Sequence, residues 1–105
     1  MCTKGYRICL SVPLGRRNGT MVLHETDGRV NGWMEVMSRR NGLSGALSAD
    51  GHITLSGALQ TLVSTMPYTA EGTIDGSKLF LTLKTAVGTS YSVSGEEFSI
   101  DDEVL

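Results

Sequence analysis

The residues best suited to bind a ligand are two arginine pairs, which occur in the same short motif. Arg16-Arg17-Asn18-Gly19 is repeated as Arg39-Arg40-Asn41-Gly42, and an Asp-Gly pair follows each copy at the same distance. An arginine side chain presents a planar fork of N–H donors that matches a carboxylate or a phosphate group. The two motifs therefore predict an anion-binding rim, with solvated loop charge as the plainer interpretation.

The two histidines lack the partners that acid–base catalysis needs. His24 and Glu25 are adjacent, so on a strand their side chains point to opposite faces and cannot act as a pair. His52 flanks a turn signal, and no serine lies in a Gly-x-Ser-x-Gly elbow. We expect His24 to make a surface hydrogen bond, and we predict that the chain is not an enzyme.

Signatures of cofactor and metal binding are also missing from the sequence. Cys2 and Cys9 are the two cysteines, and neither combines with a nearby histidine pair into a zinc-binding set. The glycines do not follow a strand that leads into a helix, so they predict no phosphate loop and no dinucleotide site. We therefore expect no cofactor and no metal.

Composition sets the broad class of the protein. A chain of 105 residues fits one domain, and a formal charge of −2 gives no overall attraction for nucleic acid or an anionic membrane. No apolar run reaches the length of an export signal or a membrane span. Two cysteines are too few for a disulfide framework, which favours a reducing compartment. We predict a cytoplasmic protein with neither nucleic acid nor membrane as partner.

Alternation of apolar and polar residues predicts strands along nearly the whole chain. The first segment runs from Tyr6 to Val12, where Tyr6, Ile8, Leu10 and Val12 alternate with Arg7, Cys9 and Ser11. About seven further segments follow with the same period of two, and no stretch shows a convincing helical period. Their apolar positions fall within 21–23, 30–36, 43–47, 53–59, 68–74, 79–83 and 91–95.

Asp-Gly pairs mark the predicted hairpin tips. Asp27-Gly28, Asp50-Gly51 and Asp75-Gly76 separate alternating segments, as hairpin turns do. Because paired residues share a face, the apolar positions fix whether each tip is even or odd in length. The pattern requires two-residue tips at Asp27-Gly28 and Asp75-Gly76, and three-residue tips at 49–51 and 86–88. All these tips meet their requirement, which supports an antiparallel meander.

Glycines on the predicted inner face favour a closed sheet. The registers place glycines opposite large residues at Gly32, Gly45, Gly57, Gly72 and Gly95, and the last two both face Leu79. Glycine inside a strand costs about 0.5–1 kcal/mol relative to alanine, and tight curvature is the natural reason for it. We predict an all-β up-and-down meander of about eight strands, closed or nearly closed as a small barrel, with a two-sheet sandwich as the alternative. The barrel domain covers residues 1–98, and 99–105 form an acidic C-terminal tail.

The meander places unlike charges at the two ends of the barrel. The loops predicted to carry the arginine pairs share one rim, whereas Asp27, Asp50 and Asp75 lie at the other. Glu25 lies beside the first of these tips and has inner-face parity. We expect its carboxylate at the mouth of the barrel, because burial without a partner would be costly.

Val22, Trp33 and Phe80 fall on the predicted outer face. Trp33 pairs with Val22 in the predicted register, and Phe80 lies opposite Glu71. Outward aromatic residues favour an interface with another molecule. The alternative is that a terminal segment of the chain folds over them.

The hairpin rhythm resembles that of calycin-type meander barrels, which include the lipocalin-like and avidin-like proteins. The stretch Asp27-Gly28-Arg29-Val30-Asn31-Gly32 is similar to hairpins of avidin-like barrels, where a turn Asp-Gly leads into a strand with an inner glycine. Lipocalins carry Gly-x-Trp on the first strand, whereas Gly32-Trp33 falls on the third predicted strand. The resemblance implies a barrel architecture and no particular ligand.

Two classes of function fit these residues. The first is a non-enzymatic binding or protein-interaction module, which uses the arginine rim or the outer patch and has a second copy as one candidate partner. The alternative is a carrier of a small apolar or anionic ligand. Its candidate binding residues are Arg16, Arg17, Arg39, Arg40, Tyr68 and Tyr91.

Overall fold

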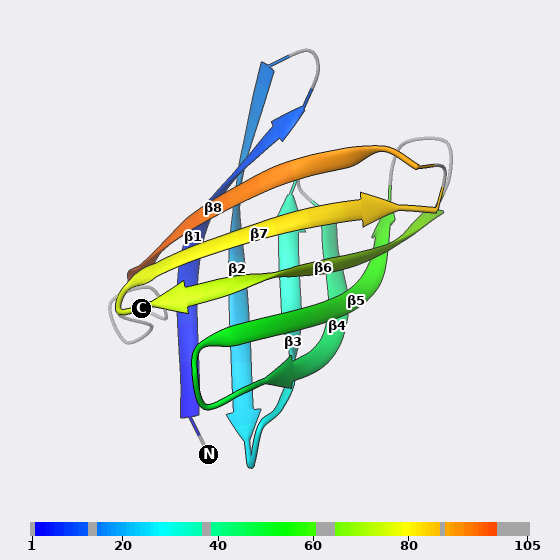
Figure 1. Cartoon of the computed structure of the whole chain (residues 1–105). Coiled ribbons are helices and arrows are strands. Elements are labelled where there is room, and N and C mark those ends of the chain that lie inside the picture. The colour runs from blue at the N-terminus through cyan, green and yellow to red at the C-terminus, as the bar shows by residue number, and fades with distance from the viewer. Residues whose placement is uncertain (1, 13–14, 37–38, 61–64, 87, 99–105) are drawn as a thin grey trace.

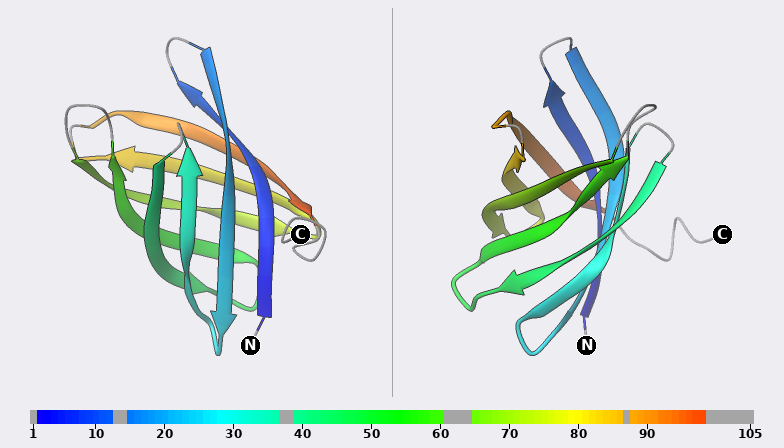
Figure 2. Two further views of the ribbon diagram at one scale, coloured as in Figure 1. Left: turned by 180° about the vertical axis from the view of Figure 1, so that it is seen from behind. Right: turned by 90° about the vertical axis from the view of Figure 1, so that its right-hand side faces the viewer.

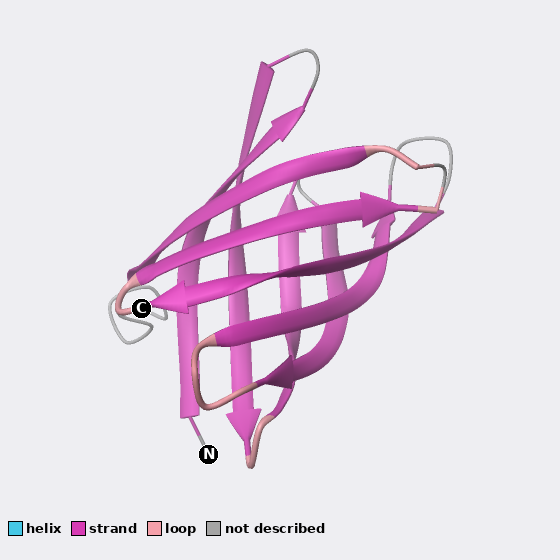
Figure 3. Cartoon of the chain, in the orientation of Figure 1, coloured by secondary structure: helices cyan, strands magenta, loops and turns pink. Residues whose placement is uncertain are grey.

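The computed structural model describes residues 2–12, 15–36, 39–60, 65–86 and 88–98, and the predicted tail at 99–105 lies outside them. The described residues form strands joined by short turns, with no helix among them (Figure 3). The strands are β1 (Cys2–Val12), β2 (Gly15–Thr26), β3 (Arg29–Val36), β4 (Arg39–Leu47), β5 (His52–Gln60), β6 (Thr65–Asp75), β7 (Lys78–Thr85) and β8 (Ser90–Phe98).

The strands form one closed antiparallel barrel in meander order. Each strand pairs with the next along the chain, and β8 returns to pair with β1 (Figure 1). The predicted up-and-down barrel is confirmed, and the sandwich alternative is wrong. The β1–β2 hairpin runs steeply relative to β6 and β7 on the opposite wall, and one of its ends extends beyond the other strands (Figure 2).

Hairpin tips set the register as the sequence pattern requires. Asp27 and Gly28 form a two-residue tip with φ angles of 53° and 83°, as a type I′ turn needs. The three-residue tips place Gly51 and Gly88 in the left-handed region, with φ angles of 91° and 89°. Glycine adopts this conformation without steric cost, which explains its place at each tip. Val87, in the second of these tips, lies outside the described residues.

The tip between β6 and β7 differs from the prediction by one residue. Asp75 is the last residue of β6 and pairs with Lys78, so Gly76 and Ser77 form the two-residue tip. Gly76 has a φ of 61°, and Ser77 is not in the left-handed region, as in a type II′ turn with glycine first. The register shifts by two residues, which leaves every side chain on its predicted face.

The inward side chains fill the interior of the barrel. The buried apolar residues are Tyr6, Ile8, Leu10, Met21, Leu23, Val30, Met34, Val36, Leu43, Ile53, Leu55, Tyr68, Ala70, Leu79, Leu81, Leu83 and Val93. They come from all eight strands and form one cluster. The core is therefore a single apolar body inside the closed sheet.

Inner-face glycines allow neighbouring strands to approach where the sheet bends. A Cβ atom added at Gly32, Gly45 or Gly72 would lie 1.9, 1.7 or 1.8 Å from a backbone carbonyl oxygen of the adjacent strand. No side chain fits at that distance, so glycine is required for this curvature. Gly72 pairs with Leu81 rather than with Leu79 as predicted, because of the shifted tip.

Candidate functional site

The arginine pairs lie within strands and not in loops as predicted. Arg16 and Arg17 belong to β2, Arg39 and Arg40 begin β4, and all four side chains are exposed. Arg16 and Arg17 pair with Ser11 and Leu10 of β1, and these two residues pair in turn with β8. In the described residues the pairing of β2 with β3 begins at Gly19, so both arginines lie on the end of β2 that pairs with β1 alone.

The two copies of the arginine motif have opposite orientations in the sheet. Gly19 of the first copy lies on the inner face, whereas Gly42 of the second lies on the outer face. The reason is the length of the hairpin tip that follows each motif. An Asp-Gly pair follows both motifs at the same distance, but it forms a two-residue tip after the first motif and part of a three-residue tip after the second. Each motif thus presents one arginine to the inner face and one to the outer face. Anion binding by all four together stays a prediction.

Tyrosines at the arginine end of the barrel belong to its packed interior. Tyr68 is buried beside Gly57, where an added Cβ would lie 2.9 Å from the Tyr68 hydroxyl oxygen. Burial raises the pKa of Tyr68 to about 12. Among the residues that the structure describes, its hydroxyl group has no hydrogen-bond partner. Tyr91 is half-buried, and Asn41 and Thr85 are buried polar residues of the same interior.

A small cavity lies at the opposite end of the barrel. It measures about 110 Å³ and is lined by Lys4, Tyr6, Leu23, Glu25, Val30, Leu47, Ile53 and Ile74. The Glu25 carboxylate accepts a hydrogen bond of 2.8 Å from the backbone N–H of Gly28, so it lies at this mouth as predicted. Ligand pockets typically measure about 300–1,000 Å³. The described interior is therefore nearly full.

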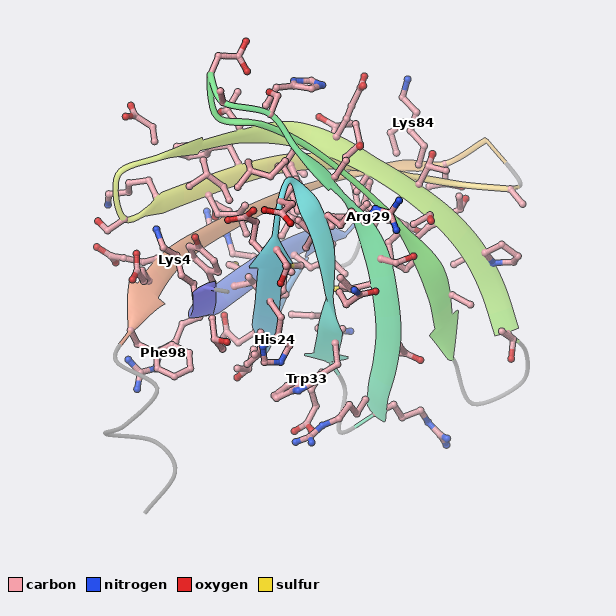
Figure 4. All side chains as sticks on the ribbon, turned by 90° about the horizontal axis from the view of Figure 1, so that it is seen from below. Lys4, His24, Arg29, Trp33, Lys84 and Phe98 are labelled. Atoms are coloured by element: carbon pink, nitrogen blue, oxygen red, sulfur yellow. The ribbon has the colours of Figure 1, made fainter. Side chains whose placement is uncertain are left out.

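One row of paired residues crosses the outer face from β8 to β4. In register order its members are Phe98, Gly5, Val22, Trp33 and Gly42, and we call it the outer row. Gly5 is buried, whereas the side chains of Val22, Trp33 and Phe98 are half-buried. Phe98 and Trp33 lie along the same side of the barrel, on either side of His24 (Figure 4).

Both aromatic residues of the outer row carry a stacked guanidinium group. The Arg40 guanidinium carbon lies 3.8 Å from the centroid of the Trp33 ring, and Arg40 Nε lies 3.2 Å from a Glu35 carboxylate oxygen. The Arg7 guanidinium carbon lies 4.8 Å from the centroid of the Phe98 ring. Such cation–π contacts hold both partners in place at an exposed surface. The sequence predicted Trp33 on this face but placed Arg40 in a ligand-binding loop. Glu35 has outer-face parity, and a strand register that pairs Arg40 with Glu35 would have placed Arg40 on the same face.

Phe80, which the sequence also proposed as an interface residue, lies apart from the outer row. It is 52% exposed on β7 and pairs with Thr73, not opposite Glu71 as predicted, because the tip of that hairpin is shifted. Strands β8 and β1 separate it from Val22 on β2. The predicted interface thus divides into the outer row and one isolated phenylalanine.

Two further observations concern the polar residues that the structure describes. His24 Nδ1 lies 2.7 Å from Thr3 Oγ1, a cross-strand hydrogen bond at the surface. Within the described parts of the chain, no three His, Cys, Asp or Glu side chains gather into a possible metal site. No helix long and apolar enough to cross a membrane occurs in the ranges that the structure describes.

Comparison of the chain with known protein families, with curated proteins and with solved structures finds no match.

Proposed function

We propose that this protein is a non-enzymatic protein-interaction module that binds its partner through the outer row. The observation that carries the proposal is Trp33, a half-buried aromatic residue on the outside of a filled barrel, stacked under Arg40. Tryptophan and arginine are the residue types most enriched at binding hot spots. A rigid sheet that presents them together offers a surface that is already ordered before binding.

The filled interior favours this function over the carrier alternative. The cavity of about 110 Å³ is smaller than the engineered 150 Å³ cavity that accommodates benzene. A ligand at the arginine end would meet the buried Tyr68 beneath the rim. The carrier function, with the arginine pairs and Tyr91 as ligand contacts, remains the second candidate.

The proposal also includes the structural class of the protein and its cellular compartment. The closed eight-stranded meander supports membership of the calycin-type barrels. The free thiol of Cys9 supports a cytoplasmic location, because that compartment keeps cysteines reduced.

Site-specific photo-cross-linking tests the interaction face. A photoreactive phenylalanine analogue replaces Val22 in the outer row, and in a control variant it replaces Thr82 on the outer face of β7. Irradiation in the cells that make the protein should give a cross-linked product with the first variant alone. Adding Trp33→Ser should remove that product. Equal products from both positions, or no product from either, would contradict the proposal.

A further inference from the structure

We infer that the partner of the outer row is a second copy of this chain, in a two-fold dimer whose axis runs parallel to β2. The inference rests on the proposed function and names its partner. A two-fold interface brings the same surface of both copies together, so that surface must be complementary to itself. The outer face meets this requirement in the size and in the charge of its side chains.

Side-chain size is complementary about Val22, the middle residue of the outer row. Trp33 lies one strand to one side of it, and Gly5 lies one strand to the other. An axis along β2 therefore places Trp33 over Gly5 of the second copy. The same operation places Phe98 over Gly42. Each aromatic ring thus meets a residue without a side chain, of which Gly42 is exposed and Gly5 is buried.

Charge is complementary in the neighbouring row of the same face. Its members in register order are Glu96, Arg7, Thr20, Glu35 and Arg40. About the same axis, Arg7 faces Glu35 of the second copy, and Glu96 faces Arg40. Every charged contact joins opposite signs, and Thr20 faces Thr20 of the second copy. Opposite charges that align in this way favour the correct pairing and its register.

The third row, on the other side of the outer row, contains no Lys, Arg, Asp or Glu side chain that could repel the second copy. It contains Thr3, His24, Asn31 and Ser44 in register order. Neighbouring strands lie about 4.8 Å apart and alternate residues about 6.8 Å apart, so the three rows cover roughly 19 by 14 Å. A standard interface buries about 800 Å² on each partner, which places this dimer at the weak end.

Charge reversal across the dyad provides the decisive experiment. Arg7→Glu and Glu35→Arg each create two like-charge contacts in a dimer of identical variants. Mixed in equal amounts, the two variants restore opposite charges at both places. Sedimentation velocity from about 10 to 500 µM should show self-association of the wild type, monomers for each variant and a dimer in the mixture.

Controls separate this arrangement from a loss of folding. Glu71→Arg changes an exposed charge on the outer face of β6 and should leave self-association unchanged. Circular dichroism checks the fold of each variant, and Glu96→Arg with Arg40→Glu gives a second complementary pair if the first does not fold.

A wild type that is monomeric at every concentration, or variants whose mixture stays monomeric, would overturn the inference. A cross-link from position 22 to a different protein would overturn the dimer and leave the proposed function intact. No cross-link of any kind would overturn both.

Discussion

Two alanine substitutions on β4 test whether inner-face glycines are required for the closed barrel. At Gly45 an added Cβ would lie 1.7 Å from the carbonyl oxygen of Thr54, whereas at Gly42 nothing lies within 4 Å. Neither glycine has a positive φ, so backbone strain does not separate the two sites. The difference between Gly45→Ala and Gly42→Ala therefore measures the close approach of β4 and β5.

The expected magnitudes follow from these contacts. Gly42→Ala should stabilise the protein by about 0.5–1 kcal/mol, because alanine loses less conformational entropy on folding. At Gly45, a contact of 1.7 Å must lengthen toward the 3.4 Å of ordinary packing, which separates two hydrogen-bonded strands. Overpacking costs about 1–3 kcal/mol, and each weakened hydrogen bond adds about 1 kcal/mol. We expect Gly45→Ala to lower the free energy of unfolding by about 3 kcal/mol, or Tm by about 12 °C or more.

Urea unfolding gives the measurement, with Trp33 fluorescence and circular dichroism as two probes. Low micromolar concentrations keep the chain monomeric, which matters because Gly42 belongs to the outer row. Equal free energies of unfolding for the two variants, within about 0.5 kcal/mol, would refute the role assigned to these glycines.

Three further variants test the interior. Tyr68→Phe removes a buried hydroxyl group that has no partner among the described residues, so stability at pH 7 should be unchanged or higher by up to about 1 kcal/mol. The pKa of Tyr68 is raised from 10.0 to about 12 in the folded state, so its stabilising effect is complete below pH 10 and is lost between pH 10 and 12. Wild type should therefore lose roughly 2 kcal/mol more than Tyr68→Phe over that interval, and parallel alkaline curves would contradict the burial. Val30→Ile adds one methylene group beside the cavity and should stabilise by about 0.8 kcal/mol, whereas Val93→Ile, away from the cavity, should be neutral or destabilising. Thermal unfolding of both variants compares them, and an equal effect would argue against a usable cavity.

Parity of apolar residues was enough to predict the meander, its faces and most of its tips. At Asp27-Gly28 the turn type and the register agree, because both residues can adopt a positive φ. The tip after Asp75 could not be placed, since parity does not distinguish two registers that differ by two residues. There the conformational freedom of Gly76 decided the outcome.

The candidate site was predictable only where a single strand register determined it. Val22 and Trp33 follow from the well-defined first Asp-Gly tip, and the structure places them side by side. The stacking of Arg40 on Trp33 was not predicted, because the motif of Arg40 was interpreted as a loop, although its pairing with Glu35 continues β4. The cavity beside Val30 depends on how side-chain volumes meet across the barrel, which no local pattern encodes.

A dilution series followed by ¹H–¹⁵N correlation spectra tests the central claim, that the outer row is a contact face. Between about 500 and 10 µM, amide signals of the end of β8, of β1 to β3 and of the start of β4 should shift together. Their common dissociation constant should match the one from sedimentation. Spectra that do not change with concentration, or shifts confined to β5, β6 and β7, would contradict the claim.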